Sequence, residues 1–412
     1  MCAEVFAMDF NPIVLSIPIF FILIGIELLI QRFSHKKIYR LQDALSNISC
    51  GITQQLSGLF LRILAIGVYQ LVFQYFSIFS LERTWWYWIA LFLLVDLAYY
   101  WAHRMSHEIN LFWGGHVVHH QSEDYNLSVA LRQSSFQVVW TFAFSLPIAV
   151  LGFNTIDFAL ISAFNTLYQF WIHTETINKM GWFEKIFNTP SHHRVHHGRD
   201  PKYIDKNHAG TLIIWDKMFG TFQEEEERPT YGITKPINSW NPVWANFSHY
   251  AEMAKEIKQI PVWKDKLRYV FAKPGWLPDY MGGYRAAQEV DKAHYQKYDT
   301  PSHYALNFYV VFQYLVALLV TSLFLFNESK FHWTEKTAIT SLIIILIVNC
   351  GALFENKAWV WWLEMLRILI YTFGWVFTAY YFNLDLMHYI GALVYGALSL
   401  SWFIYLKKHA FA

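Results

Sequence analysis

Charged residues are scarce in this 412-residue sequence: Asp, Glu, Lys and Arg make up 15% of it, against about 25% in an ordinary soluble domain. The formal net charge is only +1, so the basic surplus typical of nucleic-acid-binding proteins is missing and we expect no nucleic-acid partner. The three cysteines, Cys2, Cys50 and Cys350, lie far apart and form no CxxC pair. Their spacing argues against a zinc ribbon and against a disulfide framework.

The N-terminal region lacks the signature of a cleaved signal peptide, because no basic segment precedes its long apolar run. Hydrophobic residues make up 55% of the sequence and aromatic residues 19%. A helix needs about 20 mostly apolar residues to cross a bilayer. Nine segments are candidates: Pro12–Ile30, Leu56–Phe79, Trp85–Trp101, Phe136–Phe153, Phe158–Ile172, Tyr304–Phe326, Ala338–Leu353, Trp359–Tyr380 and Leu386–Leu406. We therefore predict an all-α integral membrane protein, a multi-span helical bundle.

One of these spans carries two opposite charges, Glu364 and Arg367, three residues apart on one helical face. Charged side chains inside a membrane span are costly unless they are paired. The two residues either pair inside the bundle, or their segment begins as an interfacial helix.

The loop after the first span is basic, with Arg32, Lys36, Lys37 and Arg40, and the positive-inside rule places it in the cytosol. Alternation of the spans then places residues 102–135 and 173–302 on the same side. We expect the endoplasmic reticulum in a eukaryote or the inner membrane in a bacterium. The only sizeable polar stretch, Thr174–His303, is predicted to form an amphipathic helical cap on the cytosolic face.

The predicted organisation has two parts. Residues 1–303 form a membrane domain with its cap, in which residues 85–238 are the catalytic core, and residues 304–412 add C-terminal transmembrane helices. The sequence carries no signal for an oligomeric state.

Histidines gather in three clusters at the predicted cytosolic ends of the spans. They are one HxxxH pair and two HxxHH triplets: His103 and His107; His116, His119 and His120; His193, His196 and His197. Positions four apart share a helix face, so each cluster can direct two imidazoles to one side. Imidazole suits iron, copper, zinc and nickel, and so many buried polar nitrogens need partners. We predict a site for two metal ions, iron or zinc, facing the cytosol.

Three further histidines lie near these clusters. His173 follows the fifth predicted span, and we predict it to be a ninth metal ligand rather than a core or surface group. His192 precedes the third cluster and is expected to support the ligands rather than bind metal. His208 is either an active-site group or a surface histidine.

Two carboxylates are candidate catalytic residues. Asp96 lies seven residues before His103, two helical turns away on the same face. It either orients a ligand histidine through the second ring nitrogen or pairs with a Tyr or Trp donor. Glu108 directly follows His107 and is a candidate ligand, proton relay or interfacial charge.

At these residues the sequence resembles the fatty acid hydroxylase/sterol desaturase superfamily, and within it the branch that hydroxylates alkylglycerols. The resemblance runs from about Leu41 to Asn238. It rests on six stretches: His103–Asn110 (HRMSHEIN), His119–Ser128 (HHQSEDYNLS), Ala130–Ser134 (ALRQS), Tyr168–Glu175 (YQFWIHTE), Asn188–Arg199 (NTPSHHRVHHGR) and Ile213–Thr221 (IIWDKMFGT). The sequence departs from that branch at His208, where an aromatic residue is expected before Ala209 and Gly210.

The resemblance implies a di-iron centre, O2 and an external electron donor, either tetrahydrobiopterin or another reductant. It implies that a membrane lipid is hydroxylated at its ether-linked carbon and then releases a fatty aldehyde. The eight histidines of the three clusters match the ligand set of the family, and Glu108 matches a glutamate linked to activity there.

Two other functions remain open from the sequence. The same scaffold serves hydroxylases and desaturases of other lipids, such as a sterol, a sphingolipid or an ornithine-lipid acyl chain. A metal transporter or sensor is more remote, because transporters usually place their ligands near the bilayer midplane.

Overall fold

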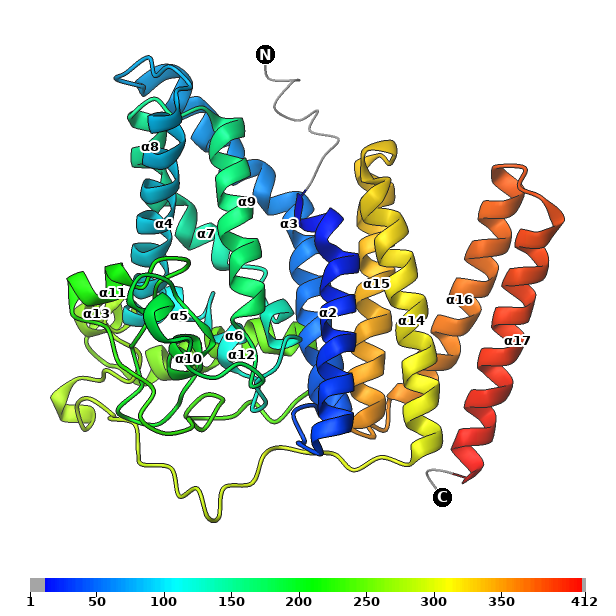
Figure 1. Ribbon diagram of the computed structural model, residues 1–412. Coiled ribbons are helices and arrows are strands. Elements are labelled where there is room, and N and C mark those ends of the chain that lie inside the picture. The colour runs from blue at the N-terminus through cyan, green and yellow to red at the C-terminus, as the bar shows by residue number, and fades with distance from the viewer. Residues whose placement is uncertain (1–11, 410–412) are drawn as a thin grey trace. The chain divides into compact units, whose positions relative to one another are not determined.

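The computed structural model describes residues 12–409, and Figure 1 shows them as a helical protein. Cys2 lies outside the described residues, and Cys50 and Cys350 are buried free thiols. The chain divides into two compact units: the first is the chain up to Asn238 together with Val243–Tyr298, and the second is Ser239–Pro242 together with the chain from Asp299 onward.

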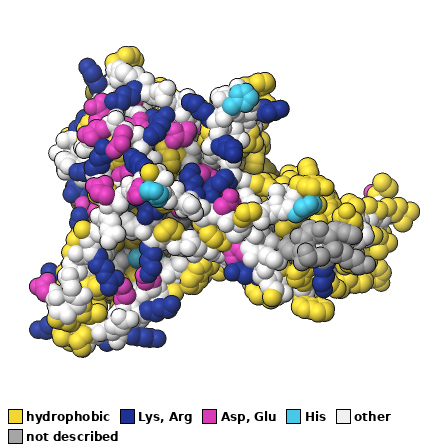
Figure 2. Space-filling model, turned by 90° about the horizontal axis from the view of Figure 1, so that it is seen from below, with side chains coloured by type: hydrophobic (Ala, Val, Ile, Leu, Met, Phe, Trp, Pro, Cys, Tyr) yellow, Lys and Arg dark blue, Asp and Glu magenta, His cyan; other side chains and the backbone are white. Residues whose placement is uncertain are grey.

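The first unit contains the longer helices α2 (Pro12–Ser34), α3 (Leu41–Phe76), α4 (Trp85–Glu108) and α9 (Thr155–Trp171), and most of α12 (Pro242–Gln259). Shorter helices complete it: α5 (Asn110–Trp113), α6 (Val117–His120), η1 (Val129–Leu131), α7 (Gln137–Thr141), η2 (Phe142–Ser145), α8 (Leu146–Val150), η3 (Gly181–Lys185), α10 (Pro190–His196), α11 (Ile214–Phe219), α13 (Trp263–Phe271) and η4 (Asp279–Met281). Charged side chains of both signs gather on the loop-rich end of this unit (Figure 2).

Helices α4 and α9 pack against each other and run to the loop-rich end of the first unit, where α4 carries His103 and His107 and His173 follows α9 (Figure 1). Their opposite ends are joined through Asp157 of α9, which accepts hydrogen bonds from Tyr87 (2.8 Å) and Arg83 (2.7 Å). The Asn154 side chain caps α9 by accepting the backbone N–H of Ile156. Both helices are thus fixed at the end remote from the histidines.

The helices that carry the HxxHH triplets are short. Helix α6 is a single turn that starts after His116, and α10 has 7 residues with Pro190 in its first turn, a position that proline tolerates well. Tertiary contacts, not helix length, must therefore hold these triplets in place, since isolated single turns are unstable.

The second unit is formed by four long apolar helices, α14 (Tyr304–Phe326), α15 (Trp333–Phe354), α16 (Val360–Tyr381) and α17 (Leu386–His409), with the short η5 (Glu328–Lys330). The predicted pairing of Glu364 with Arg367 is confirmed, because the guanidinium donates to both carboxylate oxygens at 2.8 and 2.6 Å. Arg367 also donates to Tyr395 (2.8 Å) and Gln313 (2.9 Å). These contacts link three of the four helices through one buried charge.

Five helices of the described chain are long and apolar enough to cross a membrane: Leu15–Ser34, Tyr304–Phe326, Trp333–Phe354, Val360–Tyr381 and Leu386–Lys407. A sixth is added if the bent pair Leu41–Leu61 and Ala65–Phe76 counts as one span. The chain is therefore an integral membrane protein, but the predicted count of nine spans is not confirmed.

The three predicted spans that do not pass this test lie between residues 85 and 172. In the segment Phe136–Phe153, α7, η2 and α8 follow one another as one short apolar helix, Gln137–Val150, and α9 has only 17 residues. Helix α4 has 24 residues, but it contains Asp96 and many Trp and Tyr residues, whose rings are partly polar. Apolar composition in the sequence did not reveal these short helix lengths.

Candidate metal centre

All nine histidines predicted as ligands come together in the structure, and all are buried. They form two groups within which the ring nitrogens lie within 4.8 Å of one another. The first histidine group is His103, His107, His116, His120 and His196. The second histidine group is His119, His173, His193 and His197.

The i, i+4 spacing explains this division. His103 and His107 share a face of α4, His116 and His120 share a face of the α6 turn, and all four belong to the first group. The middle histidine of each triplet points to a different side of the helix from the outer two. His119 therefore belongs to the second group and His196 to the first, so each triplet contributes to both groups.

The Nε2 atoms face one another at short range. In the first group, His116 Nε2 lies 2.8 Å from His103 Nε2 and 3.1 Å from His120 Nε2. In the second, His119 Nε2 lies 3.1 Å from both His173 Nε2 and His197 Nε2. Two nitrogens that bind one ion at right angles, each about 2.0–2.1 Å from it, lie roughly 2.9 Å apart. The observed separations fit ligands of a shared ion.

The hydrogen-bond partner of Nδ1, the other ring nitrogen, shows whether Nε2 carries a lone pair. The Nδ1 atoms of His119 and His173 lie 3.0 Å and 2.7 Å from the carbonyl oxygens of Arg132 and Gln169. A carbonyl can only accept, so each Nδ1 carries the proton and each Nε2 of the neutral ring presents a lone pair. Two lone pairs 3.1 Å apart repel each other unless a cation lies between them. The donor set therefore fits a metal ion.

The first group has the same support. His103 Nδ1 lies 2.7 Å from the carbonyl of His208, and His196 Nδ1 lies 2.9 Å from the carbonyl of Lys206. In addition, the buried Nε2 atoms of His107 and His196 have no hydrogen-bond partner among the described residues. Hydrogen bonds from Nδ1 to a carbonyl oxygen fix ring orientation in metal sites and raise the basicity of the ligand.

Burial keeps these imidazoles neutral. It lowers the pKa of His119 to about 4 and that of His196 to about 3. It also lowers the pKa values of His193 and His197 well below the ordinary value, and neighbouring histidines add to the shift. Neutral imidazole is the form that binds a metal, so the site is ready for an ion near neutral pH.

Asp96 is fully buried and accepts four hydrogen bonds. Its donors are the backbone N–H groups at 211 and 212 (2.8 and 3.0 Å), the Trp215 indole (2.9 Å) and the Asn165 amide (2.6 Å). None of these donors is a histidine ring, and the Trp donor is the one that the alternative prediction named. Asp96 thus ties α4 to α9, to α11 and to the segment before α11.

Glu108 lies near the centre but does not join either histidine group. It pairs with Arg104 at 2.9 Å, and both side chains are about one-fifth exposed. His107 Nδ1 instead faces Asp205 Oδ1 at 3.7 Å, a distance too long for a direct hydrogen bond. His192 is buried and outside both groups, and its Nδ1 has no partner among the described residues.

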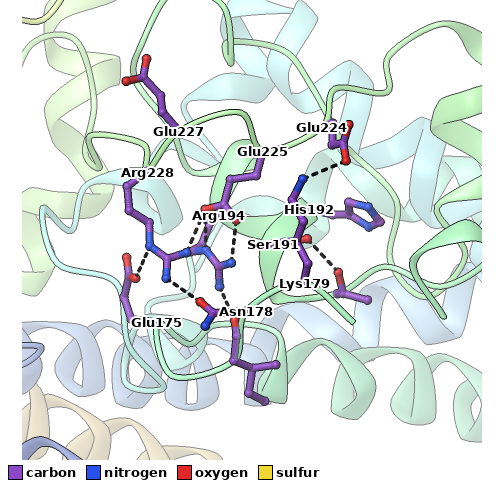
Figure 3. Close-up of polar contacts among 12 residues, drawn as sticks. Glu175, Asn178, Lys179, Ser191, His192, Arg194, Glu224, Glu225, Glu227 and Arg228 are labelled. Atoms are coloured by element: carbon purple, nitrogen blue, oxygen red, sulfur yellow. Dashed lines mark hydrogen bonds and ion pairs between the residues drawn. The ribbon is translucent and has the colours of Figure 1, made fainter. Parts of the chain in front are cut away.

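Sequence analysis missed the charged residues that hold the third cluster in place. Arg194 of α10 is fully buried, donates to both carboxylate oxygens of Glu225 (2.8 and 2.7 Å), and also donates to the carbonyls of Thr174 and Ile177 (Figure 3). Although burial opposes the charged form, the contacts with Arg194 lower the pKa of Glu225. The pair joins the helix that carries His193 to the segment that follows His173.

A signal for Arg194 was present in the sequence, because an arginine between metal-ligand histidines would be repelled by the ion unless a carboxylate neutralised it. Its partner Glu225 belongs to a run of four glutamates, so the sequence alone did not indicate which of them lies inside. In Figure 3, Arg228 approaches the same glutamate from the exposed side and also reaches Glu175.

Comparison with known proteins agrees with this geometry. The family model "Fatty acid hydroxylase" matches residues 88–221, the segment that contains all nine histidines. Alkylglycerol monooxygenase of Homo sapiens is 39% identical over 87% of this chain and 82% of its own length. The proteins of the same name from Xenopus tropicalis and Danio rerio are 38% and 37% identical, over 86% and 82% of this chain and 80% and 77% of their own lengths. No solved structure matches the chain significantly.

The chain is a helical membrane protein, and its fatty acid hydroxylase segment surrounds two buried histidine groups. Together with these relatives, the segment identifies the chain as an O2-dependent lipid monooxygenase. More narrowly, the chain belongs to the alkylglycerol monooxygenase family.

Proposed function

We propose that this monooxygenase hydroxylates the ether-linked carbon of an alkylglycerol in the membrane. Two iron ions, one in each histidine group, and O2 support the reaction, and tetrahydrobiopterin or another external donor supplies electrons. The metal assignment rests on the Nε2 atoms of His119 and His173, which lie 3.1 Å apart and direct their lone pairs at each other. The names of the relatives support the substrate.

The proposed reaction balances as follows. One oxygen atom of O2 enters the C–H bond beside the ether oxygen, and the other leaves as water after taking up two electrons and two protons. The resulting hemiacetal breaks its bond between that carbon and the ether oxygen, which gives a fatty aldehyde and a free glycerol hydroxyl. Because imidazole ligands supply no electrons, the external reductant is obligatory.

Different residues of the chain have different roles in the proposed reaction. The nine histidines hold the metal, which when bound activates O2, and the carbonyls of Arg132, Gln169, Lys206 and His208 fix the ring orientations. Asp96 is a positioning residue that acts through the segment at 211–215. We assign Glu108 to the reactants rather than to the metal, because it is partly exposed beside the first group.

We further propose that the site faces the cytosol, in the endoplasmic reticulum of a eukaryote or across the inner membrane of a bacterium. The basic loop between α2 and α3 supports this orientation. A cysteine introduced at the exposed position 264 should react with a membrane-impermeant maleimide from the cytosolic side of sealed vesicles. Reaction from the opposite side only would reverse the topology.

The test of the activity uses the purified, iron-loaded chain with a long-chain alkylglycerol, tetrahydrobiopterin and isotopically labelled O2. We expect a fatty aldehyde, with the label found in the hydroxylated product before the aldehyde exchanges with water, and none from a His119→Ala control. A folded, iron-replete sample that gives no aldehyde would remove the alkylglycerol from the proposal. The search would then move to sterols, sphingolipids and ornithine lipids.

A further inference from the structure

His208 is a tenth histidine at the metal centre, and its backbone is held on both sides. Its N–H donates to Asp216 Oδ1 (2.8 Å), and the next N–H, of Ala209, donates to Asp216 Oδ2 (2.8 Å). Its carbonyl accepts the hydrogen bond from His103 Nδ1 (2.7 Å). The main chain at His208 therefore cannot shift without disturbing a residue of the first histidine group.

The preceding residue strengthens this hold. Asn207 adopts φ +55°, a left-handed conformation that asparagine tolerates better than most residues. Its side-chain amide donates to the carbonyls of His192 (3.0 Å) and Gln223 (2.7 Å) and accepts the N–H of Gln223 (2.8 Å). The direction of the His208 side chain is thus set by a rigid loop.

That direction leads to the first histidine group. The His208 ring is completely buried, with its centroid 4.9 Å from the ring of His107 and 5.6 Å from the rings of His103 and His196. It is not one of the nitrogens that converge within 4.8 Å in either group. Its place is beside the ligands rather than among them.

Neither ring nitrogen of His208 makes a hydrogen bond of normal geometry among the described residues, although the backbone of Asp205 lies close to the ring. The Nε2 atoms of the neighbouring His107 and His196 also make none among these residues. A buried polar group without a partner is costly, and a neutral imidazole offers both an N–H donor and an acceptor nitrogen. The Nε2 atoms of His107 and His196 are assigned to the metal, so the ring nitrogens of His208 are the ones left over, and they indicate that a small polar molecule or group belongs beside the first histidine group.

We infer that His208 donates a hydrogen bond to an oxygen atom that lies against the first histidine group during the reaction. This inference deepens the proposed function and rests on it. The oxygen atom belongs either to dioxygen or to the headgroup of the lipid substrate, since both present an acceptor of the same kind. His208 is then a catalytic residue that touches a reactant, in addition to the nine metal ligands.

The test uses the full-length, iron-loaded protein with two variants at this position. His208→Phe keeps a flat ring and removes both nitrogens, whereas His208→Gln keeps an N–H donor. His249→Phe is the control, because His249 is a partly buried histidine that belongs to neither group and hydrogen-bonds Asn110 instead. For each protein, the iron content, the Kd of azide from an absorption titration and the KM for alkylglycerol are measured.

We expect His208→Phe to retain two iron ions per chain and to weaken one of the two interactions roughly tenfold, the usual effect of losing one hydrogen bond to a charged or polarised group. A weaker azide Kd with an unchanged KM assigns the bond to dioxygen, and the reverse result assigns it to the lipid. His208→Gln should recover part of the loss, and the control should lose nothing.

Unchanged azide and substrate binding in His208→Phe would overturn the inference. So would loss of iron from both His208→Phe and His208→Gln, because His208 would then hold the metal itself. Failure of the proposed function is separate: it would show as absent iron or absent aldehyde in the unsubstituted protein. If only the alkylglycerol assignment fails, the azide titration still tests His208.

Discussion

One cluster of buried polar side chains in each compact unit, the Glu364–Arg367 cluster and the histidine groups, can be compared, and their internal contacts are opposite in kind. In the second unit, the Arg367 guanidinium meets the Glu364 carboxylate, the Gln313 amide oxygen and the Tyr395 hydroxyl, so that donors face acceptors. In the first unit, His119 and His173 direct Nε2 lone pairs at each other. Burial alone does not separate a structural cluster from a binding site, whereas the match of donors and acceptors does.

The two clusters differ in whether they contain their own counter-charges. The Glu364–Arg367 cluster supplies its own counter-charges within the second unit, and membrane helices tolerate such charges only when they are paired in this way. The histidine groups contain no negative charge of their own and need a cation from outside. The Glu364–Arg367 cluster therefore serves stability, and the histidine groups serve binding. The following substitutions test this contrast.

The largest effect is expected from removing one ligand of either histidine group. His196→Ala in the first group and His119→Ala in the second should each lose iron, and monooxygenase activity should fall by at least about a hundredfold, beyond the 10- to 100-fold cost of disturbing residues that merely support ligands. His294→Ala is the control, because that histidine is exposed and its side chain pairs with Asp291, away from both histidine groups. Iron content and turnover are measured on the same samples, and full values for both in either ligand variant would remove the site assignment.

A large effect on stability, but none on the metal, is expected in the second unit. Arg367→Met leaves Glu364 as a buried charge without its partner and should cost about 3–5 kcal/mol of stability. Denaturant unfolding in detergent measures this loss, and the iron content of the protein that remains folded should stay at two ions per chain. An unchanged unfolding midpoint, or a selective loss of iron, would contradict the contrast between the two clusters.

An intermediate effect is expected from Arg194, which supports ligands without binding the metal. Arg194→Lys keeps the charge but loses the two-pronged contact with Glu225, since lysine cannot reproduce the guanidinium geometry. Iron affinity should fall about 10- to 100-fold, as measured by competition with a chelator. Lys202→Arg, at a partly exposed surface pair, is the matched control and should leave the affinity unchanged.

The smallest effect on the fold is expected at Glu108. Its pair with Arg104 is partly exposed, and pairs of this kind contribute about 0.2–1 kcal/mol. Glu108→Gln should therefore keep its iron and shift stability by no more than that, while turnover falls because the carboxylate is assigned to the reactants. Loss of iron in this variant would instead place Glu108 among the metal ligands.

The sequence predicted the nine histidines because their spacing has a direct geometric meaning. Residues four apart share a helix face, and this rule holds even in the single turn of α6, where His116 and His120 point to the first group and His119 to the second. The pairing of Glu364 with Arg367 was predictable for the same reason, together with the cost of an unpaired charge in a membrane span.

Other features had no signal of this kind in the sequence. The Nδ1 atoms of four ligands are held by backbone carbonyls, such as those of Arg132 and His208, and every residue has a carbonyl. Two of the four donors to Asp96 are backbone N–H groups, which likewise leave no mark in the sequence. The predicted count of nine spans is not confirmed, because apolar composition does not reveal how long the helices between residues 85 and 172 are.

The most direct test of the account is the number of iron ions in the purified, catalytically active protein, measured by elemental mass spectrometry against the protein concentration. The two histidine groups predict two iron ions per chain, and removal of the metal by a chelator should abolish activity, which added iron should restore. Full activity in a chain that contains no metal would show that the facing imidazole nitrogens serve another purpose, and the central claim would be wrong.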